Sequence, residues 1–275
     1  MPSLPANISD TVRTALQEDI GSGDRTALLV PAAAMARATV ITRDSAVLCG
    51  TAWFDEVYRQ LDPAIVISWN ARDGDKISPG TTVCALQGRA RPLLSGERTA
   101  LNFLQLLSGT ATVTHDYISL LSGTSTRLLD TRKTIPGLRS AQKYAVFCGG
   151  GYNHRMGLFD AILVKENHIL AVGSITKAVA QAKSQGVPVE VEVENLKQLE
   201  EAITAGADTL LLDNFDLARL REAVALNQGR VRLEVSGSVT KDNLQAIAAT
   251  GVDFISCGAL TKHVRAIDFS MRFGE

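Results

Sequence analysis

The spacing of hydrophobic residues divides the chain into two halves with different predicted architectures. In the first half, turn residues such as Asp73-Gly74-Asp75 separate short strands from amphipathic helices. The predicted strands cover residues 38–42, 46–49, 65–69 and 82–86, and the predicted helices cover residues 9–20, 53–61, 91–108 and 112–121. This mixture predicts a small α/β sandwich.

After residue 123, strands and helices alternate about every 20 to 25 residues, as βαβ units do. The predicted strands cover residues 126–129, 161–165, 188–194, 209–213, 231–235 and 252–256. The clearest helices cover residues 174–184, 196–205, 217–226 and 241–249. Right-handed βαβ units with six strands predict an incomplete parallel α/β barrel, and an open doubly wound sheet is the alternative.

These patterns also predict where the domains begin and end. We expect an N-terminal α/β sandwich domain over residues 1–108 and an α/β barrel catalytic domain over residues 109–259. Residues 260–275 are expected to pack back on the first domain. The sequence contains no low-complexity segment and no linker long enough to let the two halves move freely.

Composition narrows the classes of function. The 275 residues include 28 Lys and Arg against 29 Asp and Glu, a formal net charge of −1, which argues against a nucleic-acid partner. No apolar run approaches the ~18 to 20 residues of a membrane span, and the N-terminus lacks a signal pattern. Four cysteines without a Cys-x-x-Cys pair suggest reduced core thiols. We therefore expect a cytoplasmic protein.

The most unusual segment alternates valine and glutamate from Val189 to Glu194. In a strand, Glu190, Glu192 and Glu194 would share one face, with neighbouring carboxylates roughly 7 Å apart and repelling by about 2 kcal/mol. A solvated edge strand is one explanation. Because helices are predicted on both sides, we expect the glutamates to point into the barrel, beside cations or a metal.

Cations are concentrated in one region. Residues 127–166 contain seven Lys and Arg against three Asp and Glu. Lys165 follows a buried run of Ala-Ile-Leu-Val, so it should face the active end of the barrel. Four arginines and lysines occur in turns containing glycine or proline, where their side chains are aimed: Arg132, Lys133, Arg139 and Arg155.

Small-residue turns follow the last two predicted strands. Backbone N–H groups in Ser236-Gly237-Ser238 and Cys257-Gly258-Ala259 could cradle a phosphate, as the final loops of barrels commonly do. A site with cationic, acidic and phosphate-binding parts suits a substrate that is a phosphosugar or a diphosphate. Lysines, arginines and an Mg²⁺ ion bound by the carboxylates would neutralise the charge of such a substrate. The sequence contains no P-loop nucleotide-binding motif.

Five segments resemble the quinolinate phosphoribosyltransferase family, and the resemblance extends from Glu18 to Arg265. They are Glu-Arg-Thr-Ala-Leu-Asn at 97–102, Asp-Thr-Arg-Lys-Thr-Ile-Pro-Gly-Leu-Arg at 130–139, Asn-His-Arg-Met-Gly-Leu at 153–158, Leu-Val-Lys-Glu-Asn-His at 163–168 and Leu-Asp-Asn-Phe at 212–215. A related branch, associated with molybdate-transport operons, shares Arg-Lys-Thr-Ile-Pro-Gly. The start at Asp130-Thr131 and the run from Lys165 to His168 favour the quinolinate branch.

The resemblance implies a complete reaction. Ribose 5-phosphate would move from phosphoribosyl pyrophosphate to the pyridine nitrogen of quinolinate, with release of pyrophosphate. Loss of CO₂ would then give nicotinate mononucleotide, a precursor of NAD. The family also implies Mg²⁺ as cofactor, an N-terminal sandwich with an incomplete barrel, and a head-to-tail homodimer.

The resemblance further implies roles for individual residues. Lys165, Glu192 and Asp213 are the expected catalytic residues, with Glu192 and Asp213 at the ribose and metal, directly or through water. The expected substrate-binding residues are Arg98 (supplied across the dimer), Thr131, Arg132, Lys133 near the diphosphate, His154, Arg155 and Lys165. The resemblance implies that Ser236, Gly237 and Gly258 bind the 5′-phosphate, and the small-residue turns add Ser238, Cys257 and Ala259 to the expected phosphate-binding residues. The family often has glycine or asparagine where this chain has Ser238, so only the part played by that side chain differs.

Two alternatives remain at this point. A barrel lyase could use Lys165 as a Schiff base, which borohydride trapping would reveal. The segment from Asp73 to Gly80 also resembles the lysine-bearing turn of a biotinyl or lipoyl carrier domain, with Lys76 as the modified residue. A hairpin of similar shape explains that segment more simply.

Overall fold

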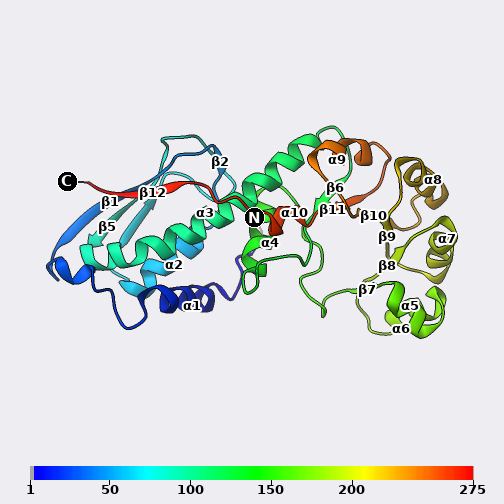
Figure 1. Cartoon of the computed structure of the whole chain (residues 1–275), viewed down its shortest axis with the longest axis horizontal. Coiled ribbons are helices and arrows are strands. Elements are labelled where there is room, and N and C mark those ends of the chain that lie inside the picture. Colours follow the sequence, from blue (N-terminus) through cyan, green and yellow to red (C-terminus); the bar gives the residue numbers. More distant parts are fainter. Residues whose placement is uncertain (1–2, 275) are drawn as a thin grey trace. The chain divides into compact units, whose positions relative to one another are not determined.

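The computed structural model describes residues 3–274 and divides the chain into two compact units (Figure 1). The first unit contains the residues up to His115, together with Thr134–Gly150 and the residues from Leu260 onward. The second unit contains Asp116–Lys133 and Gly151–Ala259.

The first unit is built on an antiparallel sheet with the strand order β12-β1-β5-β3. The strands are β1 (Met35–Thr42), β3 (Val66–Trp69), β5 (Thr82–Arg89) and β12 (Phe269–Gly274), and a separate pair joins β2 (Ala46–Val47) to β4 (Lys76–Ile77). The C-terminal strand β12 pairs with β1, from Thr42 opposite Phe269 to Arg37 opposite Gly274. The C-terminal segment is therefore part of this sheet.

Helices bury the apolar side of this unit. They are α1 (Ile8–Ile20), the 3₁₀ turn η1 (Ala27–Leu29), α2 (Thr51–Leu61) and α3 (Ala90–Leu120). On α2, Trp53, Phe54 and Tyr58 are almost fully buried in the core. Their spacing places them on one face of the helix, as the hydrophobic pattern predicts.

Helix α3 is continuous, so the prediction of two helices over residues 91–108 and 112–121 is wrong. The gap between the two predicted helices covers residues 109–111 and begins with Gly109, a residue type that usually weakens a helix. A Cβ atom at Gly109 would lie 2.2 Å from the backbone oxygen of Arg265. This glycine therefore admits the returning C-terminal segment against the helix rather than ending it.

A second difference concerns residues 134–150, which belong to the first unit although the predicted boundaries placed them in the barrel. They contain the helix α4 (Arg139–Cys148), which is absent from the predicted elements and begins at Arg139, a residue predicted to lie in a turn. Ala141, Tyr144 and Ala145 are buried in the core of the first unit, at the spacing of one helix face. Lys143 is also buried, with 1% exposure.

The second unit contains a six-stranded parallel sheet with the order β6-β11-β10-β9-β8-β7. Its strands are β6 (Arg127–Leu129), β7 (Ile162–Val164), β8 (Val189–Val193), β9 (Thr209–Asp213), β10 (Arg232–Ser236) and β11 (Phe254–Ser256). The helices are α5 (Glu166–Val172), α6 (Ile175–Lys183), α7 (Leu196–Ala205), α8 (Leu217–Asn227) and α9 (Lys241–Ala248). The short α10 (Ala259–Lys262) begins at the last residue of this unit, and its other residues belong to the first unit. The prediction of an incomplete six-stranded barrel is confirmed.

A short segment lies beside the free edge of β6. Tyr152 forms a single parallel bridge with Leu129, donates its N–H to Leu128 O at 2.8 Å, and accepts from Asp130 N–H at 3.1 Å. This bridge is absent from the predicted elements. It fixes the start of the segment that carries His154 and Arg155.

Among the described residues, no helix combines the length and the apolar character needed to cross a membrane.

Candidate active site

The candidate site lies where the parallel strands of the second unit end. Lys165 follows β7, Asp213 ends β9, Ser236 ends β10 and Cys257 follows β11, while Glu192 is near the end of β8. Because the carboxyl ends of parallel strands meet at one edge, these residues share a rim. Ligands bind at this rim in α/β folds.

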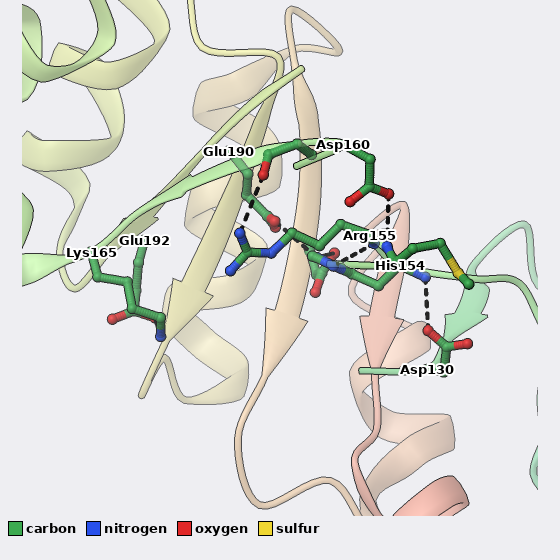
Figure 2. A network of polar contacts seen from close by, with 10 residues as sticks. Asp130, His154, Arg155, Asp160, Lys165, Glu190 and Glu192 are labelled. Atoms are coloured by element: carbon green, nitrogen blue, oxygen red, sulfur yellow. Dashed lines mark hydrogen bonds and ion pairs between the residues drawn. The ribbon is translucent and has the colours of Figure 1, made fainter. Parts of the chain in front are cut away.

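Lys165 and Glu192 form the closest charged pair on this rim. The Lys165 Nζ atom lies 2.6 Å from Glu192 Oε2, and the two side chains point toward each other in Figure 2. Lys165 is also the N-cap residue of α5, where its backbone N–H donates to His168 Nδ1 at 2.9 Å. The strand-to-helix junction therefore aims the lysine across the ends of β7 and β8.

Asp213 is electrostatically linked to this pair. Partial burial raises the pKa of the Asp213 carboxyl, the charge of Glu192 raises it further, and the Lys165 ammonium lowers it. Asn214 Nδ2 donates to Asp213 Oδ2 at 2.8 Å. The structure thus brings together the three predicted catalytic residues, with two carboxylates for one ammonium.

The turn after β10 comes close to the same carboxylate. Gly237 has a φ of 91°, and a Cβ atom there would lie 3.6 Å from Asp213 Oδ1. Ser238 follows with a φ of 50°, in the left-handed region that favours glycine or asparagine. The backbone of Ser236-Gly237-Ser238 therefore borders the acidic part of the rim.

The turn after β11 packs against the predicted diphosphate residues. A Cβ atom at Gly258 would lie 2.9 Å from Lys133 Cδ and 3.4 Å from Thr131 Oγ1. Thr131 Oγ1 accepts the backbone N–H of Lys133 at 3.0 Å, which shapes this turn. The neighbouring Cys257 is buried, and its backbone N–H donates to Leu129 O at 3.0 Å. Glycine thus lets the Lys133 side chain lie over the turn that ends in Ala259.

His154 is held by groups from three strands or strand ends. The backbone N–H of His154 donates to Asp130 Oδ1 at 2.9 Å, and Asn153 Nδ2 donates to Asp130 Oδ2 at 2.6 Å. The ring Nε2 lies 2.8 Å from Glu190 Oε2 and 3.5 Å from Glu234 Oε2. Figure 2 shows His154 between Asp130 and Glu190.

Arg155 lies beside this network. Its Nη1 donates to Ala161 O at 3.2 Å. Burial lowers the pKa of the Arg155 guanidinium, and the positive charge of Arg132 lowers it further. Glu190 and Asp160 act in the opposite direction and favour the charged form. Two neighbouring guanidinium groups of this kind suit a substrate with more than one negative charge.

The three alternating glutamates do not share one environment, which corrects part of the prediction. Glu190 is buried and Glu192 is half-buried, whereas Glu194 lies beyond the end of β8 and is exposed. The strand is one residue shorter at that end than predicted, so only two of the glutamates face the interior.

Sequence reasoning missed Glu234, which is 2% exposed. Burial raises the pKa of this carboxyl to about 8, with the charge of Glu190 as the next cause. The available signal was a single glutamate in an otherwise apolar predicted strand, because such a charge requires a specific partner. Asp160, which accepts the N–H groups of Met156 and Gly157, was also missed.

Arg98 belongs to α3 in the first unit, so its expected role is not visible in the geometry of the second. It lines a hollow of about 290 Å³ together with Asp19, Asp24 and Ser95. The Ser95 hydroxyl donates to Asp24 Oδ2 at 2.8 Å, which ties the segment after α1 to α3.

The donor set at Glu192 and Asp213 fits Mg²⁺. Carboxylate oxygens are the ligands that this ion prefers, and it commonly keeps several of its waters. Burial is the main cause of the raised pKa of Asp213, and the neighbouring charge of Glu192 adds to it; a cation bound between the two carboxylates would offset both effects.

Comparisons with known proteins identify the family of the chain. The model of the quinolinate phosphoribosyl transferase C-terminal domain matches residues 110–272, and that of the N-terminal domain matches residues 24–108. A probable carboxylating nicotinate-nucleotide pyrophosphorylase of Bacillus subtilis is 41% identical over 257 residues, covering 92% of this chain and 89% of the relative. The carboxylating nicotinate-nucleotide pyrophosphorylase of Mycobacterium leprae is 40% identical and covers 95% of each chain.

The same relationship holds in three dimensions. The structure of the nicotinate-nucleotide pyrophosphorylase from Francisella tularensis matches with a TM-score of 0.94 and 50% identity, covering 99% of this chain and 98% of the other. Both family models together span most of the chain, and the relatives match over nearly their whole length. The chain therefore belongs to the quinolinate phosphoribosyltransferase family.

Proposed function

We propose that this protein transfers ribose 5-phosphate from phosphoribosyl pyrophosphate to the nitrogen of quinolinate, with decarboxylation to nicotinate mononucleotide. Pyrophosphate and CO₂ are the other products, and the pathway is de novo NAD biosynthesis. The observation that carries the proposal is the single rim on which Lys165, Glu192 and Asp213 meet beside two glycine turns.

Quinolinate carries two carboxylates, so its site needs several fixed cations. Arg132, Arg155 and Lys165 supply them in this proposal, with His154 beside them. Each charge-assisted hydrogen bond to a carboxylate contributes roughly 1.5 to 3 kcal/mol. The electrostatic interaction between the two guanidinium groups supports this assignment, because a bound dianion would relieve their repulsion.

The transfer itself needs charges of both signs. The bond between the anomeric carbon and the diphosphate oxygen breaks, its electron pair leaves with pyrophosphate, and the pyridine nitrogen bonds to that carbon. Positive charge develops on the sugar, where Glu192 and Asp213 stabilise it. Lys133, with Thr131 beside it, stabilises the departing diphosphate.

Mg²⁺ is the proposed cofactor. Glu192 and Asp213 would hold it, directly or through water, and the ion would neutralise part of the diphosphate charge. The reaction requires no covalent nucleophile from the protein.

The 5′-phosphate has its own proposed site. The backbone groups of Ser236-Gly237-Ser238 and Cys257-Gly258-Ala259 bind it in the two turns that follow β10 and β11. Gly237 and Gly258 support this assignment, because a Cβ atom would lie close to Asp213 at the first position and to Lys133 at the second. Glycine leaves the backbone of each turn open beside these side chains.

A homodimer completes the proposed enzyme, with Arg98 entering the site of the other subunit. Exposed apolar residues in both units support association: Leu28 and Leu29 are 66% and 84% exposed, and Leu158 and Phe159 are 72% and 80% exposed. The proposed location is the cytoplasm, although several plant relatives are named as chloroplastic or mitochondrial.

The direct test mixes the protein with quinolinate, phosphoribosyl pyrophosphate and Mg²⁺ and follows nicotinate mononucleotide by chromatography. We expect turnover with quinolinate and little with nicotinate, which lacks the second carboxylate. Absence of mononucleotide from a folded, dimeric sample would refute the proposal. Turnover of another acceptor in place of quinolinate would favour the branch associated with molybdate-transport operons.

The lyase alternative has a specific structural objection. The Lys165 Nζ atom lies 2.6 Å from Glu192 Oε2 and is engaged in that contact, whereas a Schiff base needs the same nitrogen to bond to a carbonyl carbon. Borohydride should therefore leave the activity unchanged in the presence of substrate. No structural observation favours the carrier-domain alternative for Lys76, which lies in the short strand β4.

A further inference from the structure

The interior of the barrel holds two buried glutamates that no step of the proposed reaction uses. Glu190 comes from β8 and Glu234 from β10, two strands that flank β9 in the sheet. Both carboxylates reach the same imidazole nitrogen of His154, at 2.8 Å and 3.5 Å. His154 therefore links β8 to β10 across β9, and Figure 2 shows its contact with Glu190.

Both nitrogens of the His154 ring are engaged. The backbone N–H of Arg155 can only donate, and it lies 2.9 Å from His154 Nδ1, so Nδ1 must accept. The proton therefore sits on Nε2 and is donated to Glu190 Oε2. One tautomer and one ring orientation are thereby selected.

Burying two carboxyl groups side by side is costly, even with the pKa of Glu234 raised to about 8 so that this group is largely protonated near neutral pH. Each must give up its hydration, and an apolar layer of the kind that usually fills a barrel would avoid that cost. Within residues 3–274, Glu190 Oε1 is buried and has no hydrogen-bond partner. Stability alone therefore does not account for the pair, which points to a role in function.

The role follows from what His154 contacts next. The ring of His154 accepts a hydrogen bond from the backbone N–H of Arg155. The backbone N–H of His154 donates to Asp130 Oδ1. The ring thus determines the backbone from which the Arg155 guanidinium extends. Displacing a substrate-binding group by about 1 Å can cost a hundredfold in rate.

We propose that Glu190 and Glu234 are positioning residues for recognition of the dicarboxylate substrate, acting through His154 to aim Arg155. This inference rests on the proposed function, because it assigns Arg155 to a quinolinate carboxylate. It predicts that the two glutamates affect affinity for quinolinate rather than for phosphoribosyl pyrophosphate.

The first test compares Glu190→Gln and Glu234→Gln with Glu222→Gln, an exposed glutamate on α8 that serves as the matched control. We expect the KM for quinolinate to rise roughly tenfold or more in the first two variants. The KM for phosphoribosyl pyrophosphate should stay within about twofold, and the control should match the wild type. Equal increases in both KM values, or no increase, would overturn the inference.

The second test asks whether the glutamates act through His154. In a double-mutant cycle, Glu190→Gln should change the KM for quinolinate by less than about twofold in the His154→Ala background. Full additivity of the two effects would refute action through the histidine.

A measurement on the wild-type protein covers the case in which these variants do not fold. With only four histidines in the chain, ¹⁵N NMR can resolve the His154 ring and report which nitrogen carries the proton. We expect Nε2–H with Nδ1 as acceptor. A mobile ring or the other tautomer would refute the inference even if quinolinate is turned over, whereas a protein without that activity would refute the proposed function instead.

Discussion

The Lys165 ammonium lies 2.6 Å from Glu192 Oε2, at the point where two neighbouring parallel strands end. Lys165 is 48% exposed and Glu192 17% exposed, so the pair is open to solvent on the lysine side. A second carboxylate, Asp213, interacts with both. A cation that an anionic substrate can reach thus lies directly beside the carboxylates that would face the ribose.

Removing either of two predicted carboxylate-binding cations should reduce activity strongly. We expect Lys165→Ala and Arg132→Ala to lower kcat/KM by roughly tenfold to a hundredfold or more, because each removes a charge-assisted hydrogen bond. Steady-state kinetics with Lys177→Ala, an exposed lysine on α6, provide the control. Near-normal constants for both site variants would reject the assignment.

A side chain at Gly258 should disturb the diphosphate region without unfolding the protein. In Gly258→Ala the new Cβ would approach Lys133 Cδ to 2.9 Å, so the flexible lysine must move. We expect the KM for phosphoribosyl pyrophosphate to rise about three- to tenfold. The melting temperature should match that of Gly274→Ala, where a Cβ meets nothing within 4 Å. An unchanged KM would show that Lys133 does not act there.

The free energy of unfolding should depend on the protonation of Glu234. Its pKa is raised from 4.5 to about 8 in the folded state, so between these values the folded protein binds more protons than the unfolded chain. Stability should therefore fall as the pH rises through this window. Urea unfolding at several pH values should show a smaller fall for Glu234→Gln, and equal slopes for both proteins would contradict this expectation.

Helix α3 should not tolerate a side chain at Gly109. In Gly109→Ala the Cβ would lie 2.2 Å from the backbone oxygen of Arg265, and neither backbone can give way easily. We expect a loss of about 1 to 3 kcal/mol in the free energy of unfolding, as overpacking usually costs. Calorimetry should show the lower melting temperature, and a variant as stable as the wild type would exclude this close approach.

The periodic elements could be predicted because their signal is local. The strand ending at Asp213 and the helix α7 match their predicted limits, since a buried parallel strand and an amphipathic helix each leave a distinct hydrophobic pattern. Lys165 could be placed at the active end because it directly follows a buried apolar strand. A charge at that point avoids unpaired burial by lying at the carboxyl end of the strand.

The parts that were missed depend on contacts between distant segments. Helix α4 packs through Tyr144, whose hydroxyl donates to Asp73 across 71 positions of sequence. The continuity of α3 depends on the return of Arg265 to Gly109. The raised pKa of Glu234 depends in part on the charge of Glu190, which lies in another strand. No local pattern encodes these partners.

The bridge between Tyr152 and Leu129 has a mechanical consequence. A full ladder would tie the segment carrying Arg155 to the sheet along several residues, so that any shift would break many hydrogen bonds at once. With one bridge, the segment beyond it depends on side-chain contacts, among them the two hydrogen bonds that Asp130 accepts from Asn153 and His154. Substitutions of residues that hold this segment, such as Asp130, should change the affinity for a ligand while the parallel sheet remains folded.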